Sequence, residues 1–252
     1  MAFPFAWMAL SSVKRHAEAI SFPPTLLPRE WHLENYARVF DAAPFDRYLI
    51  NSGIQATAIA LAVMATSVLA AYAFARLRFR GREALFVLFL ATVMVPPEVA
   101  LIPNFLVVKT LGWYNTYLAL IVPPSAHVLS IFLLRQAFRS LPRELYEAAL
   151  LDGCTHSRYV ARIALPLVAP TVAVVGFLAF LRAWNDLLWP LIITSSKDMR
   201  TIQVGLMAFS TDAGTDIPLV MAGSTVAVVP IVLVFLLAQR RIIDTMAHSG
   251  LK

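Results

Sequence analysis

The stretch INSGIQATAIALAVMATSVLAAYAFA, residues 50–75, runs for 26 positions without a charged side chain. An α-helix needs about 20 apolar residues to cross the hydrocarbon core of a bilayer. The whole chain has the same character, because 59% of its residues are hydrophobic and only 14% are charged. Soluble domains are about a quarter charged. We therefore expect an all-α, polytopic membrane protein.

Four further segments are apolar over a comparable length. They are residues 84–97 with an extension to 103, residues 117–134, residues 165–181 followed by 187–194, and residues 217–238. Together with residues 50–75 they predict five complete spans in a single transmembrane domain covering residues 1–252. Residues 1–13 are apolar but too short to cross unaided, and we interpret them as part of an incomplete first span.

Basic residues collect on one side of these spans. Twelve of the 21 Lys and Arg residues, but only five of the 15 acidic residues, fall in one set of connections: Arg76, Arg78, Arg80, Arg82, Arg135, Arg139, Arg143, Arg158, Arg162, Arg240, Arg241 and Lys252. Cytoplasmic loops carry an excess of Lys and Arg, so this side and the C-terminus are predicted to be cytoplasmic. Residues 14–48, the longest polar stretch, then form an extracytoplasmic loop with short helices.

The cytoplasmic side includes a short acidic segment, ELYEAALLDG, at residues 144–153. Pro142 suits the first turn of a helix, and Glu144 is favourable near its positive end. Gly153 stands where a left-handed residue would end that helix. Thr155 or Ser157 would cap a second short helix, after which Pro166 marks the return to the membrane. The pattern predicts two short helices that project from the bilayer.

Glu147 is followed by two small residues, Ala148 and Ala149. Their size would let the backbone of a partner protein approach closely, and Glu147 would then pair with a basic residue of that partner. A solvated amphipathic linker fits the same spacing equally well.

The longer pattern Glu147-Ala-Ala-x-x-x-Gly153, followed by Ile163-x-Leu165-Pro166, resembles the EAA motif of ABC importer permeases. Further stretches are similar to the carbohydrate-importer subfamily, which includes the maltose-type second permease and the glycerol 3-phosphate permease. They are Asn35-Tyr-x-x-Val-Phe40, Ala71-Tyr-Ala-Phe-Ala-Arg-Leu-Arg-Phe-Arg-Gly81, Phe132-Leu-Leu-Arg-Gln-x-Phe138, Trp184-Asn-Asp-x-Leu-Trp-Pro190 and Met221-Ala-Gly223. The family's usual subunit has six spans with a full-length first one, and this chain departs from it there.

The resemblance implies the ABC importer transmembrane fold and a mechanism. Residues 142–166 would be the coupling-helix segment, which docks in a cleft of a separate ATPase subunit. Glu147 would pair with an arginine there, Gly153 would permit the turn, and Ile163, Leu165 and Pro166 would anchor the second helix.

The resemblance also implies partners and a location. The partners would be a second permease in a heterodimer, ABC ATPase subunits and an extracytoplasmic solute-binding protein. The location would be the bacterial cytoplasmic (inner) membrane. The solute would be carbohydrate-like: a sugar, oligosaccharide, polyol or glycerol 3-phosphate.

Three polar residues are candidates for a solute pathway. Asn104 follows Pro96, Pro97 and Pro103, which interrupt a span, and interrupted helices are tolerated where they line a cavity or pack against protein. A structural kink fits these prolines at least as well. Asn185 and Asp186 lie toward the outer end of their span, after Arg182, and ionisable groups at membrane depth suggest function. The alternative for this second group is an interfacial anchor, with Trp184 and Trp189 in the aromatic belt.

Several chemistries lack a signature in the sequence. No Walker motif is present, so ATP and Mg²⁺ would be bound by the partner ATPase, and no cofactor is expected in this chain. No paired carboxylates, nucleophile–base arrangement or metal-ligand spacing is found, so neither an enzyme nor a metal site is expected, and no nucleic-acid partner is predicted. The remaining rivals are a self-sufficient secondary transporter of a small polar solute, which usually shows internal repeats, and a membrane-embedded enzyme.

Overall fold

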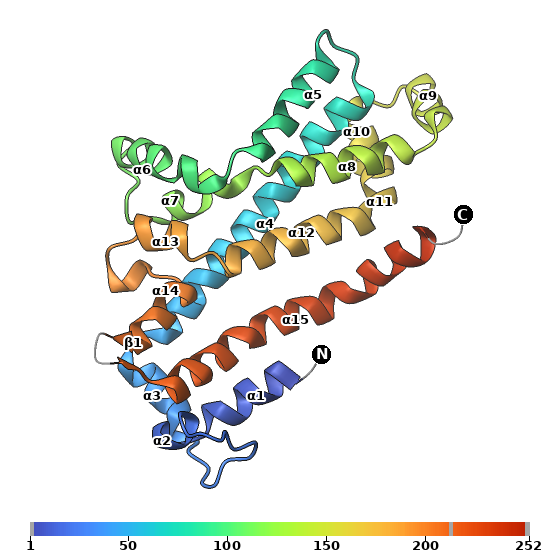
Figure 1. Ribbon diagram of the computed structural model, residues 1–252. Coiled ribbons are helices and arrows are strands. Elements are labelled where there is room, and N and C mark those ends of the chain that lie inside the picture. Colours follow the sequence, from blue (N-terminus) through green and yellow to red (C-terminus); the bar gives the residue numbers. More distant parts are fainter. Residues whose placement is uncertain (1–2, 212–213, 250–252) are drawn as a thin grey trace. The chain divides into compact units, whose positions relative to one another are not determined.

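The computed structural model describes residues 3–211 and 214–249, and over the last turns of the final helix it describes the backbone alone. Lys252, and with it the expected cytoplasmic C-terminus, lies outside the described residues. Figure 1 shows the described chain as a succession of helices. The α-helices are α1 (Phe3–Ser12), α2 (His16–Ala19), α3 (Glu34–Ala42), α4 (Phe45–Arg76), α5 (Arg82–Ala91), α6 (Leu101–Thr110), α7 (Tyr117–Ile121), α8 (Val128–Ser140), α9 (Arg143–Leu151), α10 (His156–Tyr159), α11 (Leu165–Leu167), α12 (Ala169–Trp184), α13 (Leu188–Ile193), α14 (Ile202–Leu206) and α15 (Ile217–Ser249).

Shorter elements join these helices. The 3₁₀ turns are Thr92–Met94, Pro97–Ala100, Pro123–Ser125, Lys197–Met199 and Met207–Phe209, and Val160–Ala164 is a π-helical segment. Strands β1 (Ser210–Thr211) and β2 (Gly214–Thr215) form one antiparallel pair in which Ser210 faces Thr215. The predicted all-α class is confirmed for the described residues apart from this two-residue ladder.

Two helices are long and apolar enough to cross a membrane unbroken, namely Phe45–Arg76 and Ile217–Leu237. Three further pairs of consecutive helices are long and apolar enough only when taken together, and each pair is bent. They are Arg82–Met94 with Pro97–Thr110 (bend of 92°), Tyr117–Ser125 with Val128–Ser140 (46°), and His156–Leu167 with Ala169–Trp184 (83°). The first bend falls at Pro96, as expected of adjacent prolines that lack a backbone N–H. The described chain therefore has between two and five candidate spans.

The chain divides into two compact units, and the first contains residues 1–55, 113–120 and 184–234. Its long polar loop folds back on the end of α1. Asn35 donates from Nδ2 to the carbonyls of Ser12 (2.9 Å) and Lys14 (3.1 Å), and the hydroxyl groups of Tyr36 and Ser12 are 2.8 Å apart. The expected short helices are confirmed here as α2 and α3.

Buried amides hold other loops of the first unit. Asn51, which is only 3% exposed, donates to the carbonyls of Asp198 and Arg200 (both 2.8 Å) and accepts from the Tyr117 hydroxyl at 2.6 Å. Asn115 accepts at Oδ1 from the backbone N–H groups of residues 195 and 196. These bonds fix the loop between α13 and α14 within the unit.

The second unit contains residues 56–112, 121–183 and 235–252. Its core is rich in aromatic rings, because Phe74 packs against Phe86 (5.3 Å between ring centroids) and Tyr72 packs against Phe138 (6.1 Å). Tyr159 is fully buried. These side chains gather the ends of α4 and α8 and the start of α5, and α9 and α10 follow from α8 (Figure 1).

Candidate functional site

The first helix of the segment 142–166 begins one residue later than the sequence suggests. Pro142 is the N-cap, with ψ 139°, and α9 starts at Arg143. Pro142 therefore lies just outside the helix. Its lack of an N–H has no cost there, because an N–H at the start of a helix has no acceptor within that helix. Glu144 lies in the first turn, where a carboxylate is favourable.

The end of α9 is a Schellman motif. Gly153 has φ +74°, its N–H donates to the Leu150 carbonyl (3.0 Å), and the Cys154 N–H donates to the Ala149 carbonyl (2.9 Å). This pair of bonds requires a left-handed residue between them, which glycine adopts without steric cost. The expected conformation of Gly153 is confirmed.

The second short helix is capped by Thr155, whose Oγ1 accepts from the Arg158 N–H at 3.4 Å. The helical run continues through the π-helical turn Val160–Ala164 to Leu167 and bends by 83° before α12. Pro166 lies inside this run, so the bend comes at Val168 (φ −100°, ψ 8°) and not at the proline. Because Pro166 has no N–H to donate to the preceding turn, the wide π-turn before it is a consistent local response.

The two alanines after Glu147 differ in exposure. Ala149 is 5% exposed and packs within its own chain, whereas Ala148 is exposed. Glu147 also points outward, and its Oε1 lies 3.3 Å from Nε of Arg143, four residues earlier. Both side chains are more than 60% exposed, and such a surface pair stabilises a helix only weakly. Glu147 and Ala148 are therefore accessible on one helix. Of the other motif residues, Ile163 and Leu165 are half-buried and Pro166 is exposed.

Four aromatic residues that the sequence reasoning missed tie this segment to the unit. His156 Nδ1 is 3.0 Å from the Tyr72 hydroxyl and 3.3 Å from that of Tyr146. The Tyr146 ring stacks on His156 and meets Tyr159 edge to face, with 5.1 Å between the tyrosine centroids. Tyr72 is 84 residues from His156, so no local pattern announces the contact. The cluster joins α9 and α10 to α4.

Arg76, the last residue of α4, holds the point where α9 leaves α8. Its Nη2 donates to the carbonyls of Phe138 (2.9 Å) and Leu141 (2.7 Å). These carbonyls lie at the end of α8, where the helix leaves them without a partner in the next turn. The end of α4 and the α8–α9 junction are therefore one joint.

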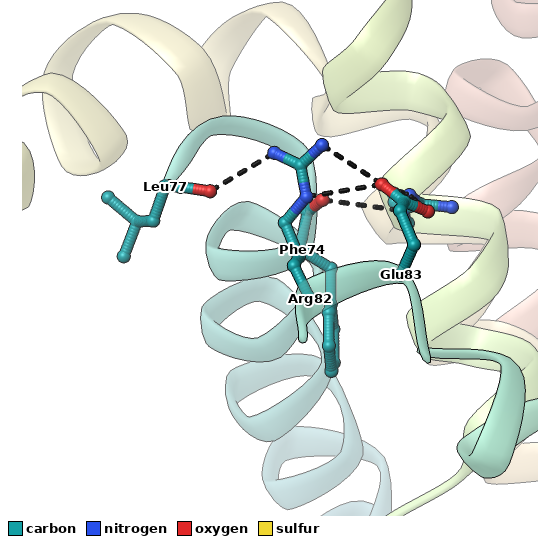
Figure 2. Close-up of polar contacts among 5 residues, drawn as sticks. Phe74, Leu77, Arg82 and Glu83 are labelled. Carbon is teal, nitrogen blue, oxygen red and sulfur yellow. Dashed lines mark hydrogen bonds and ion pairs between the residues drawn. The ribbon is translucent and has the colours of Figure 1, made fainter. Parts of the chain in front are cut away.

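A second arginine, Arg135 of α8, is almost fully buried at 4% exposure. Its Nη2 lies 2.8 and 2.7 Å from the two carboxylate oxygens of Glu83, and its Nε donates to the Phe74 carbonyl. Arg82 donates to Glu83 from the other side and to the Leu77 carbonyl at 3.1 Å (Figure 2). The carboxylate thus binds two guanidinium groups and fixes the loop between α4 and α5.

The three pathway candidates fall in different parts of the chain. Asn104 is an exposed residue of α6 in the second unit. Asn185 and Asp186 belong to the first unit, where Asn185 Oδ1 accepts from Gln203 (3.3 Å) and Asp186 Oδ1 accepts from the Trp189 N–H (3.4 Å). Asp186 therefore contributes to the start of α13.

The two tryptophans are buried, in contrast to the aromatic-belt interpretation. Trp184 is 3% exposed and donates from Nε1 to the Ala227 carbonyl, and Trp189 is 9% exposed and donates to the Ala119 carbonyl. An indole N–H inside protein needs an acceptor, and here each finds a backbone carbonyl of another helix. Both side chains are packing residues of the first unit.

Comparison with known proteins identifies the family. Residues 62–247 match the description "Binding-protein-dependent transport system inner membrane component". The trehalose/maltose transport system permease protein MalG of Thermococcus litoralis is 35% identical, covering 99% of this chain and 91% of its own. The sulfoquinovosyl glycerol transport system permease protein SmoH of Agrobacterium fabrum is 33% identical, covering 99% of this chain and 88% of its own.

The fold matches a solved structure as well. A bacterial ABC transporter involved in the import of the acidic polysaccharide alginate contains a chain that superposes with a TM-score of 0.84 at 21% identity, covering 95% of this chain and 90% of that one. The match shows the ABC importer permease fold. The chain belongs to the family of binding-protein-dependent transport system inner membrane components, and it is a transport subunit rather than an enzyme.

Proposed function

We propose that the chain is a permease subunit that moves a carbohydrate-like solute across the bacterial cytoplasmic membrane. The solute class is a sugar, oligosaccharide, polyol or glycerol 3-phosphate. The similarity to permease proteins named for trehalose/maltose and sulfoquinovosyl glycerol transport supports it. The subunit works with a second permease in a heterodimer, with ATPase subunits that bind ATP and Mg²⁺, and with an extracytoplasmic solute-binding protein.

The topology has five complete spans and a partial first one, with residues 76–82 and 139–165 in the cytoplasm. The concentration of arginine in these connections supports the orientation. Labelling of single cysteines from outside, in a background without Cys154, tests it. Modification of a cysteine at position 80 by an impermeant reagent would contradict this orientation.

Coupling to the ATPase occurs through residues 142–166. The observation that carries this step is the exposed face of α9, where Glu147 and Ala148 are accessible while the helix is held from behind by Tyr146 and Ala149. Glu147 exchanges its weak surface pair with Arg143 for a desolvated pair with a basic residue of the ATPase. The left-handed Gly153 and the Thr155 cap hold the second helix against the same partner.

The test compares two charge reversals on one helix. Glu147→Arg leaves the partner's cation facing another cation, which costs about 2–5 kcal/mol of binding. It should release the ATPase subunit in a pull-down and abolish solute uptake, while the amount of subunit in the membrane stays at the parent level. Glu144→Arg, in the first turn of the same helix, should have a much smaller effect. Parent-level attachment and uptake by Glu147→Arg would refute the assignment of α9 as the coupling helix.

A further inference from the structure

An open pocket of about 1510 Å³ lies in the second unit beside α9. We call it the arginine pocket, because seven arginines line it against a single carboxylate, Glu147. The lining arginines are Arg76, Arg78, Arg80, Arg82, Arg135, Arg139 and Arg143. So many like charges around one hollow repel each other, and a bound anion would relieve that repulsion.

Four of the seven guanidinium groups already have partners. Arg76 binds the carbonyls at the end of α8, and Arg143 pairs with Glu147. Arg82 and Arg135 share Glu83, as Figure 2 shows for the labelled Arg82 and Glu83. These contacts hold the frame of the pocket in one geometry.

The other three guanidinium groups lack such partners. Arg78, Arg80 and Arg139 are exposed, and among the side chains that the structure describes none of the three has a carboxylate within ion-pair distance. A guanidinium group presents a planar set of donors that matches the oxygens of a phosphate group. The pocket therefore has three cations ready for a phosphate-bearing ligand.

The wall between these arginines is apolar. Leu77 and Phe79 alternate with Arg78 and Arg80 along the chain, and Phe79 is 42% exposed. Along α5, which starts directly after this loop, Val87 (62%) and Leu88 (63%) are exposed too. A soluble phosphate compound would leave this apolar surface exposed, whereas the acyl chains of a lipid would cover it.

The pocket also lies at the depth of a headgroup. The uncharged stretch 50–75 has the length of a membrane span, and Arg76 follows it directly. In the cytoplasmic orientation proposed above, residues 76–82 are therefore at the inner surface of the bilayer. Basic pockets at the cytoplasmic ends of membrane helices are suited to anionic lipid headgroups.

We propose that the arginine pocket binds the phosphate headgroup of an anionic phospholipid of the cytoplasmic leaflet through Arg78, Arg80 and Arg139, with the acyl chains lying along α5. The inference rests on the membrane orientation under the proposed function, but not on the role of Glu147. A bound headgroup would make the lipid a structural neighbour of α9.

Native mass spectrometry of the assembled importer, delipidated and then titrated with phosphatidylglycerol or phosphatidylcholine, tests the proposal. The parent should retain phosphatidylglycerol in preference to phosphatidylcholine. Arg78→Gln/Arg80→Gln should weaken retention by about 30-fold, since each arginine near anionic lipid contributes about 1 kcal/mol. Arg15→Gln/Arg29→Gln removes the same charge from exposed residues outside both the pocket and the segment 142–166, and it should leave retention unchanged.

The alternatives give different results. Equal retention of both lipids, or equal loss in the two double variants, overturns the proposal. Displacement of the lipid by millimolar inorganic phosphate assigns the pocket to a soluble anion instead. Release of the ATPase subunit by Arg78→Gln/Arg80→Gln with lipid retention intact makes the pocket a protein contact. Because Glu147→Arg should release the ATPase without loss of lipid, failure of the coupling role is distinguishable from failure of lipid binding.

Discussion

The loops of the first unit and the arginine-rich loops of the second unit treat their polar side chains differently. In the first unit Asn35, Asn51 and Asn115 each make at least two hydrogen bonds to backbone groups. In the second unit Arg78 and Arg80 are exposed with no carboxylate partner among the described side chains, and Glu147 has only a weak surface pair. Polar side chains that form hydrogen bonds within the chain stabilise its fold, and exposed ones without a partner in the chain are available to bind another molecule.

The largest effect on stability is expected at Asn51. Asn51→Leu leaves two carbonyls and the Tyr117 hydroxyl without their partner in a buried place, and each such group costs about 1–3 kcal/mol. Thermal unfolding of the purified subunit in detergent should show a loss of at least about 3 kcal/mol. Asn104→Leu, at an exposed position of α6, is the matched control and should change stability little. Similar losses in both variants would remove the distinction between paired and unpaired amides.

Two glycines separate packing from backbone conformation. A Cβ on Gly205 would lie 2.2 Å from Cδ2 of the buried Tyr48, so Gly205→Ala should destabilise the first unit by about 1–3 kcal/mol. A Cβ on Gly153 meets nothing within 4 Å, but its φ of +74° is unfavourable for alanine by about 1 kcal/mol.

Thermal unfolding and ATPase attachment should both be measured for these variants. Gly205→Ala should lower the melting temperature with attachment retained, and Gly153→Ala should weaken attachment more than stability. Gly53→Ala, in the interior of α4 with open space around it, should be neutral or slightly stabilising. If Gly153→Ala keeps full attachment, the Schellman turn is not needed for coupling.

A smaller effect is expected at the aromatic cluster. Tyr72→Phe removes the hydroxyl that meets His156 Nδ1, which should cost about 1 kcal/mol of stability. Because the bond joins α10 to α4, uptake per ATP hydrolysed should fall while the ATPase stays attached. Tyr146→Phe, whose hydroxyl contact of 3.3 Å is longer, should do less. The ratio of uptake to hydrolysis in proteoliposomes measures both variants.

The smallest effect concerns acid. The Thr25 hydroxyl and the Arg29 N–H donate to Glu18, and these bonds hold the pKa of that exposed carboxyl below its usual value of 4.5. A lowered folded-state pKa stabilises above the unfolded value, and the contribution is lost as pH falls through the folded pKa. Melting curves above and below pH 4.5 should show a slight acid-induced loss in the parent that Glu18→Gln lacks. An unchanged acid response in Glu18→Gln would assign it to other carboxylates.

Local chemistry in the sequence predicted the local structure well. The glycine at the end of α9, the short helices within residues 14–48 and the break at Pro96 follow from turn, cap and proline rules. Pro166 was expected to mark the return to the membrane, and it lies in the first turn of α11, where a proline is compatible with a helix. The chain bends two residues later, at Val168. Rules for single residues thus predict that an element is present, but they place its first and last residues less accurately.

Contacts between distant residues could not be predicted in the same way. No local sequence pattern predicts the hydrogen bond between Tyr72 and His156, or the one from Trp189 to the Ala119 carbonyl. Which distant residues meet depends on how the helices pack. The sequence suggested an aromatic-belt position for Trp184 and Trp189, and their burial contradicts that interpretation. The number of spans could not be predicted for the same reason. It depends on whether two helices that are joined by a bend form one membrane span or two separate segments.

The two carbonyls that Arg76 binds have a mechanical consequence. They belong to Phe138 and Leu141, on either side of the residue where α8 ends, so the connection into α9 is pinned by the last side chain of α4. A helix that hung on a slack linker would absorb a pull by stretching that linker. Here a force applied to α9 would pass through the two hydrogen bonds of Arg76 into the end of a 32-residue helix, and it would reach α4 without being absorbed in a linker.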